Sequence, residues 1–280
     1  MNIKNIGIVG YGLIGGSMGM ALKKYTSHNV YAFDMDEKVR EYAVKNSFCD
    51  NAFLPDSEML GECDIVYIGL YPYMTVDFIN QNVNSFKENA IICDLCGVKS
   101  YIMNNTDKKL RFIGAHPMAG KEVNGIFNAS ADLFEGASFI ITKDENTDKD
   151  ALKEIEFLAK KIGFSKVVKT NPQNHDKMIT YTSQLPHIAS VAYVMQDGFK
   201  KCEGYYAGSF KDMARVAKIN PYLWEELFKI NKEILSTQID EYIDALTDIK
   251  NAVLSDDKTL FEILLKSKEL KEWQDENYKD

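Results

Sequence analysis

Two of the four histidines in this chain stand where acid–base chemistry could occur. His116 directly follows the apolar run "RFIGA", and an imidazole there titrates near neutral pH. His187 lies in "TSQLPHIAS", where a proline bends or begins a helix and leaves a carbonyl group unpaired. Both also have a structural interpretation, as a strand cap and as a locally satisfied buried side chain. We expect His28 to be a surface residue and His175 to be a structural partner of Asp176.

A glycine-rich turn near the start of the chain points to a second kind of chemistry. Gly10-x-Gly12-x-x-Gly15 follows an apolar run, precedes helix-like sequence, and is followed by Asp34 at the end of the next apolar run. Gly10 would permit the tight turn, Gly12 the approach of a pyrophosphate, and Gly15 the packing of helix on strand. The alternative is an ordinary turn with a solvent-facing aspartate. The pattern predicts dinucleotide binding by Gly10, Tyr11, Gly12, Leu13, Ile14, Gly15 and Asp34.

The residues after the second apolar run favour NAD over NADP. Asp34 can accept hydrogen bonds from a ribose diol, whereas its charge would repel a 2′-phosphate. The run reads "DMDEKVR", so the nearest arginine is Arg40, a helix turn or two away.

Arg215 and two cysteines complete the candidates. Arg215, in "GSFKDMARVAKINP", needs a carboxylate partner, which is either a ligand or a protein group such as Asp212. Cys93 and Cys96 have Cys-x-x-Cys spacing, but residues three apart in a strand point to opposite faces. No second pair exists to complete a metal site. We therefore predict structural or site-lining thiols and no metal centre.

The elements that position these residues change character along the chain. Up to about residue 169, short apolar runs alternate with helix-like segments at 14–24, 37–46, 75–84 and 147–163, which predicts a mostly parallel sheet with helices on its faces. The predicted strands are "NIGIVG", "VYAFD", "CDIVYIGL", "NAIICDL", "RFIGA", "ASFIIT" and "SKVVKT". Because the carboxyl ends of parallel strands face the ligand crevice, this topology puts His116 beside the cofactor.

Beyond about residue 171 the sequence is helical, with apolar residues three to four apart. Pro172 and Pro221 stand where helices could start, and one helix is expected to run through residues 221–246. The fold class is α/β: a Rossmann-type dinucleotide-binding domain at 1–169, then an all-helical substrate-binding and dimerisation domain at 170–280. Apolar residues on more than one helix face suggest a homodimer.

Composition limits the partners. Lys plus Arg number 33 and Asp plus Glu number 41, a net charge of −8 that disfavours nucleic-acid binding. No apolar run is long enough to span a membrane, so we expect no membrane association. Five cysteines and a start without an export signal indicate reduced thiols in a cytoplasm.

Five motifs in this order resemble the prephenate dehydrogenase family. They are "GYGLIGGSMGMAL", "DLCGVKS", "GAHPMAGKEVNGIFNASADLFEGASFIIT", "HDKMITYTSQLPHIAS" and "GSFKDMARVAKINPYLWEELFKIN". The resemblance implies oxidative decarboxylation of prephenate to 4-hydroxyphenylpyruvate in tyrosine biosynthesis, with hydride passing to NAD. The related arogenate dehydrogenases, which convert arogenate to tyrosine, share the pattern. His116 matches the family's catalytic histidine, and His187 and Arg215 match its substrate-binding positions.

Three positions depart from the family pattern. Gly97 stands where many members have a serine that supports the catalytic histidine, Ala214 where a threonine is frequent, and Gln184 where a histidine is common. Two other classes of function fit the residues less well. A non-catalytic NAD-binding sensor would not explain why His116, His187 and Arg215 all match. A dehydrogenase for β-hydroxyacids usually has a lysine base on its helical half, and no such motif is present.

Overall fold

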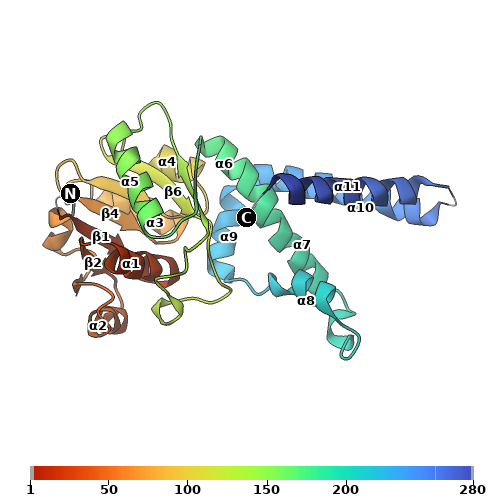
Figure 1. Ribbon diagram of the computed structural model, residues 1–280, viewed down its shortest axis with the longest axis horizontal. Helices are drawn as coiled ribbons and strands as arrows, with labels where there is room; N and C mark the ends of the chain where they lie inside the picture. Colours follow the sequence, from red (N-terminus) through yellow and green to blue (C-terminus); the bar gives the residue numbers. More distant parts are fainter. Residues whose placement is uncertain (1–2, 256, 279–280) are drawn as a thin grey trace. The chain divides into compact units, whose positions relative to one another are not determined.

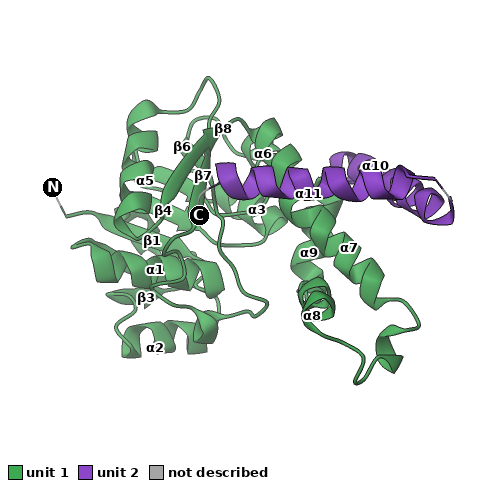
Figure 2. Ribbon diagram, turned by 45° about the vertical axis from the view of Figure 1, so that its right-hand side comes forward, with its two compact units in different colours: residues 1–231 green, residues 232–280 purple. Residues whose placement is uncertain are grey.

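The computed structural model describes residues 3–255 and 257–278. These fall into two compact units, residues 1–231 and 232–280, coloured green and purple in Figure 2. The first unit holds every residue singled out above, and the second is a pair of helices.

The first unit is built on a sheet that has eight strands within the described residues (Figure 1). Its order is β3-β2-β1-β4-β5-β6-β7-β8, and all neighbours are parallel except β6 and β7. The strands are β1 (Asn5–Val9), β2 (Asn29–Phe33), β3 (Asn51–Phe53), β4 (Ile65–Ile68), β5 (Ile91–Asp94), β6 (Arg111–Pro117), β7 (Ser138–Thr142) and β8 (Lys166–Thr170). The predicted α/β class and its mostly parallel sheet are confirmed.

Helices cover both faces of this sheet because successive strand residues point to opposite sides. On one face Ile8 packs in a cluster with Leu22 and Ile155, and on the other Val66 packs with Ile79. The connecting elements are α1 (Leu13–Tyr25), α2 (Glu37–Lys45), η1 (Glu58–Glu62), α3 (Pro72–Gln81), α4 (Ser100–Asn105), η2 (Ile126–Asn128) and α5 (Lys149–Lys161). Burial on both faces accounts for the nearly continuous apolar runs.

The remainder of the first unit is helical, and prolines begin two of its helices as predicted. Asn171 and Asn220 cap the helices that start at Pro172 and Pro221, each accepting a backbone N–H with its side chain. A π-helical turn precedes α7, which contains the remaining proline of this region, Pro186. The elements are α6 (Pro172–Ile179), η3 (Thr180–Gln184), α7 (Leu185–Val194), η4 (Phe199–Lys201), α8 (Gly208–Arg215) and α9 (Pro221–Ile230).

The helix expected over residues 221–246 is broken at Asn231. Its backbone leaves helical geometry there (φ −94°, ψ 17°), and its buried side-chain amide donates to the Thr180 hydroxyl at 3.3 Å and to Gln184 Oε1 at 3.4 Å. Asparagine favours such bonds outside helices, because its amide competes with the backbone. The second unit begins directly after this residue.

The second unit consists of α10 (Lys232–Leu254) and α11 (Thr259–Asn277). Both helices carry large apolar side chains that are exposed in the single chain. Examples are Ile243, Leu246 and Val253 on α10, and Phe261 and Leu264 on α11. Among residues 3–255 and 257–278, no helix combines the length and apolar character that crossing a membrane requires.

Candidate active site

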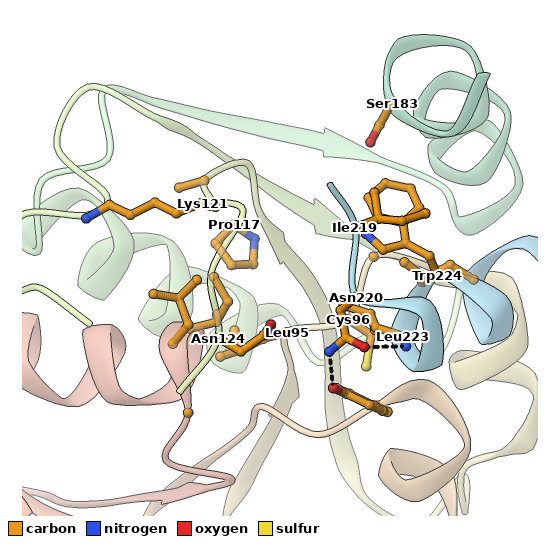
Figure 3. Close-up of a pocket in the computed structure, with 18 of the residues that line it drawn as sticks. Leu95, Cys96, Pro117, Lys121, Asn124, Ser183, Ile219, Asn220, Leu223 and Trp224 are labelled. Atoms are coloured by element: carbon orange, nitrogen blue, oxygen red, sulfur yellow. Dashed lines mark hydrogen bonds between the residues drawn. The ribbon is translucent and has the colours of Figure 1, made fainter. Parts of the chain in front are cut away.

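A cavity of about 680 Å³ lies in the first unit, where the carboxyl ends of β1, β4, β5 and β6 meet the helices that follow Pro172. Figure 3 shows Pro117 and Asn124 on one side, Leu223 and Trp224 on the other, and Ser183 pointing in from a helix. The polar lining residues that sequence analysis did not single out are Lys121, Glu122, Asn124, Ser183, Lys218 and Asn220. All six lie within the motifs quoted above, but neither their type nor their spacing distinguished them from the other residues of those motifs.

The glycine-rich loop forms one end of this cavity. Gly10 has φ +80°, a left-handed conformation that glycine adopts without strain. A Cβ at position 15 would lie 2.1 Å from the Gly10 carbonyl oxygen, so only glycine lets α1 pack this closely. A Cβ at position 12 would meet no atom within 4 Å, and Gly12, Leu13 and Ile14 line the cavity. The N-terminus of α1 thus faces open space without a capping side chain or an acidic residue, which suits an anionic pyrophosphate.

Asp34 is fixed beside this loop at the end of β2. Its Oδ2 accepts the backbone N–H of Tyr11 at 2.8 Å, and its Oδ1 accepts that of Asp36 at 2.9 Å. Both oxygens keep further lone pairs for a ribose diol. Tyr11 contributes only its backbone, because its side chain is buried and its hydroxyl donates to the Phe48 carbonyl. Arg40 donates to the carbonyl oxygens of Asp34 and Met35. The loop and Asp34 therefore fit a dinucleotide.

His116 stands at the end of β6, on the cavity wall, and is the first member of a hydrogen-bonded chain. Its Nδ1 lies 3.0 Å from Nε2 of His175, whose Nδ1 lies 2.8 Å from Oδ1 of Asp176. Asp176 also accepts the backbone N–H groups of Lys99 and Ser100, both at 2.8 Å. The pairing of His175 with Asp176 was predicted from the sequence and is confirmed, whereas their link to His116 was not predicted.

Burial and hydrogen bonding set the charge states of these three side chains. It lowers the pKa of His116 well below its ordinary value, with the charges of His175 and Lys99 acting in the same direction. Burial also lowers the pKa of His175. For Asp176 burial opposes ionisation, but the hydrogen bonds from His175, Ser100 and Lys99 outweigh it and hold its pKa below the ordinary value. Two neutral imidazoles and one carboxylate follow at neutral pH.

A fully buried ion pair supports the strand ends next to His116. Lys99 Nζ donates to Oδ2 of Asp94 and, at 2.6 Å, to the carbonyl oxygen of Ala115. The backbone N–H of Cys96 also donates to Asp94 Oδ2, at 3.0 Å. These bonds tie the end of β5 to β6 at the residue before His116, so the pair fixes the position of the histidine backbone.

Gly97 faces the His116 ring across the cavity wall. A Cβ at position 97 would lie 3.7 Å from both Cε1 and Nε2 of His116 and 3.5 Å from Leu227. These are ordinary van der Waals distances, so the position has room for a small side chain. A serine hydroxyl at position 97 would therefore lie beside the imidazole edge that is not bonded to His175.

The two predicted substrate-binding residues differ in their placement. His187 lines the cavity, its Nδ1 donates to the Ser183 carbonyl at 2.7 Å, and its ring lies on Trp224 with centroids 3.9 Å apart. Burial lowers its pKa. Arg215 is not part of the cavity lining and is 61% exposed, and its ion-pair partner is Glu122, not Asp212. Glu122 does line the cavity, so Arg215 contacts a lining residue without lining the cavity itself.

The cysteines and the remaining histidine have structural surroundings. Cys93 is a residue of β5 and is buried in the core cluster of Ile8 and Leu22, whereas Cys96 lies on the cavity wall 3.3 Å from the Thr75 hydroxyl. Burial raises the pKa of Cys96 to about 12, and all five cysteines are free. His28 was expected at the surface, but it is 93% buried, and its Nδ1 accepts the backbone N–H of Lys4 at 3.2 Å. No group of His, Cys, Asp or Glu among the described residues is arranged to hold a metal ion.

Comparison with known proteins agrees with this architecture. Residues 18–168 match the family model "Prephenate dehydrogenase, nucleotide-binding domain", and residues 171–267 match "Prephenate dehydrogenase, dimerization domain". A cyclohexadienyl dehydrogenase of Zymomonas mobilis is 30% identical, over 91% of this chain and 90% of that protein.

Two solved structures are similar to this chain over nearly its whole length. Prephenate dehydrogenase from Aquifex aeolicus, in complex with hydroxyphenyl propionate and NAD+, has a TM-score of 0.87 and 27% identity, covering 97% of this chain and 98% of that one. Arogenate dehydrogenase from Synechocystis has a TM-score of 0.81 and 25% identity, covering 96% and 99%. Both family models, the curated relative and the shared fold lead to one conclusion: the chain belongs to the prephenate dehydrogenase family.

Proposed function

We propose that this protein catalyses the NAD-dependent oxidative decarboxylation of prephenate to 4-hydroxyphenylpyruvate. The observation that carries the proposal is the shared cavity: His116, a neutral base, and Gly12 at the N-terminus of α1 line the same space. An enzyme that removes a hydride and a proton from one carbinol needs an acceptor for each within reach of the substrate.

NAD is the proposed cofactor. The free N-terminus of α1 would hold the pyrophosphate, and Asp34 would accept the ribose hydroxyls. When bound, the nicotinamide supplies the hydride acceptor. The relative from Aquifex aeolicus was solved with NAD+, which supports this choice.

His116 takes the proton of the substrate hydroxyl as the hydride leaves the same carbon. The resulting ring ketone loses its carboxylate as carbon dioxide, and the electron pair of the broken carbon–carbon bond passes through the ring to the ketone oxygen. The phenolate so formed recovers the proton from His116. The products are therefore 4-hydroxyphenylpyruvate, carbon dioxide and NADH, and the histidine returns to its starting state.

His187 and Arg215 are proposed to bind the substrate's two carboxylates. A carboxylate beside His187 favours the imidazolium form and would raise the pKa that burial lowers. Arg215 would exchange Glu122 for a substrate carboxylate, a charge-assisted contact worth about 1.5–3 kcal/mol before the loss of the existing pair is subtracted.

Arogenate is the second candidate substrate, because one structural relative is an arogenate dehydrogenase. It carries an ammonium group where prephenate carries a keto oxygen. Glu122 is the carboxylate on the cavity lining that could pair with an ammonium group.

We further propose a homodimer formed through the helical C-terminal region. The second unit exposes apolar side chains on both α10 and α11, and the dimerization-domain model reaches residue 267. Under this proposal residues 1–169 bind the nucleotide and residues 170–280 supply substrate contacts and the dimer interface. Five free thiols suit a reducing compartment such as the cytoplasm.

The proposal is tested by following NADH formation with the full-length protein. Prephenate and arogenate are each offered with NAD and with NADP. We expect the highest kcat/KM for prephenate with NAD. Preferred turnover of arogenate would identify the second candidate, and no turnover of either compound would refute both.

A further inference from the structure

The hydrogen-bonded series His116–His175–Asp176 determines which ring nitrogens carry protons. The carboxylate of Asp176 fixes the first of these positions. An ionised carboxylate can only accept hydrogen bonds, and Asp176 already accepts the backbone N–H groups of Lys99 and Ser100. Its 2.8 Å contact with Nδ1 of His175 therefore requires a proton on that nitrogen. Asp176 thus selects one of the two neutral forms of His175.

The same reasoning passes the choice on to His116. With its proton on Nδ1, His175 presents a lone pair at Nε2, so the 3.0 Å contact is made by a proton on Nδ1 of His116. The Nε2 atom of His116 then carries the free lone pair. That atom lies on the side of Gly97, which lines the cavity.

The surrounding charges do not compete for these positions. Lys99 is a cation whose charge acts on both imidazoles, and its ammonium group donates to Asp94 and to the Ala115 carbonyl. Within the described residues, the series Asp176–His175–His116 therefore has one consistent order of hydrogen-bond donors and acceptors, which ends at the cavity.

We propose that His175 and Asp176 are positioning residues that hold the proton of His116 on Nδ1 and so keep its Nε2 as the base facing the substrate. The proposal rests on the function proposed above and deepens it. When Nε2 takes the substrate proton, His116 becomes an imidazolium, its Nδ1–H still donates to His175, and Asp176 supplies the nearest negative charge in the line. On return of that proton to the phenolate the original arrangement is restored.

Two variants of His175 in the full-length protein separate this role from a packing role. His175→Gln preserves the order of donors and acceptors, because an amide can donate to Asp176 and accept from His116. His175→Leu removes the acceptor and leaves the buried Nδ1–H of His116 unpaired, which favours the form with the proton on Nε2. His28→Gln is the matched control, since His28 is also buried and lies outside the cavity lining.

The first readout is the ¹⁵N spectrum of the imidazoles, which four histidines make simple to assign. We expect both His116 and His175 to carry the proton on Nδ1 in the wild type. His116 should keep that form in His175→Gln and change to Nε2–H in His175→Leu. A wild-type spectrum with the His116 proton on Nε2 would overturn the proposal, even if His175→Leu does not fold.

The second readout is steady-state kinetics with prephenate, with the Kd for NAD measured beside it. We expect His175→Leu to lower kcat roughly 10- to 100-fold, as for the loss of a buried hydrogen-bond partner. His175→Gln and His28→Gln should remain within a few-fold of the wild type, and the Kd for NAD should not change. Equal kcat in the Leu and Gln variants would refute a positioning role.

The two proposals fail in different ways. If the wild type does not oxidise prephenate but the spectra follow the expected pattern, the proposed function is wrong and the proton arrangement stands. If the wild type oxidises prephenate and His175→Leu keeps both its kcat and the Nδ1 proton of His116, the arrangement is wrong and the function stands.

Discussion

Gly97→Ser would place beside His116 the hydroxyl that the resemblance to the family implies for this position. The structure has room for it, because a Cβ at this position lies 3.7 Å from His116 Nε2 and 3.5 Å from Leu227. The added Oγ can reach the imidazole edge or the substrate hydroxyl without moving the backbone, since Gly97 does not have a positive φ.

The size of the effect follows from one added hydrogen bond. A neutral hydrogen bond contributes about 0.5–1.5 kcal/mol, which corresponds to roughly a 2- to 13-fold change in rate. We expect kcat with prephenate to stay within about tenfold of the wild type, in either direction, and Tm to be unchanged. The assay is NADH formation at saturating NAD, with a thermal melt of the same preparation.

Gly15→Ser is the control, because position 15 has no room for a side chain whereas position 97 does. A Cβ at position 15 would lie 2.1 Å from the Gly10 carbonyl oxygen, a contact that the backbone cannot relieve without opening the loop. That variant should lose NAD binding or fold poorly. A folded Gly97→Ser protein with a loss of kcat beyond about 100-fold would refute the argument, because it would mean that the space beside His116 is needed by the substrate.

Three further predictions test other parts of the account. Arg215→Ala should raise KM for prephenate far more than the Kd for NAD, as steady-state kinetics and NAD titration would show; comparable losses would indicate a structural role. Lys99→Met should lower the free energy of unfolding in urea by about 3–5 kcal/mol, because it leaves Asp94 as an uncompensated buried charge, whereas the exposed Lys87→Met should change it little. The third prediction concerns pH: the base must be neutral, and burial holds the pKa of His116 well below its ordinary value of about 6.5. We therefore expect kcat/KM to be constant above pH 7 and to fall only as the pH drops through that lowered pKa. A fall centred at or above pH 6.5 would contradict this prediction.

Local patterns in the sequence were enough to predict much of the fold. The strand–glycine–helix order around Gly10 and Gly15 and the position of His116 after an apolar run depend on neighbours within a few residues. The predicted strands were found in the sheet for that reason. Strand β3 was missed, because its three residues, Asn51–Phe53, are too few to show a pattern.

Contacts between distant segments could not be read in the same way. His116 and His175 are 59 residues apart, and Arg215 and Glu122 are 93 apart, so only the folded chain shows that they touch. Asp212 looked like the partner of Arg215 because it is three residues away. The break at Asn231 also escaped prediction, since it depends on Thr180 and Gln184 of another helix.

The central claim is that His116 is the base for oxidation of prephenate, and His116→Asn tests it most directly. Prephenate-dependent NADH formation is measured with the Kd for NAD as the control for an intact cofactor site. We expect turnover to fall by about 10²–10⁴-fold while the Kd for NAD is unchanged. Near-normal turnover by the folded variant would contradict the account.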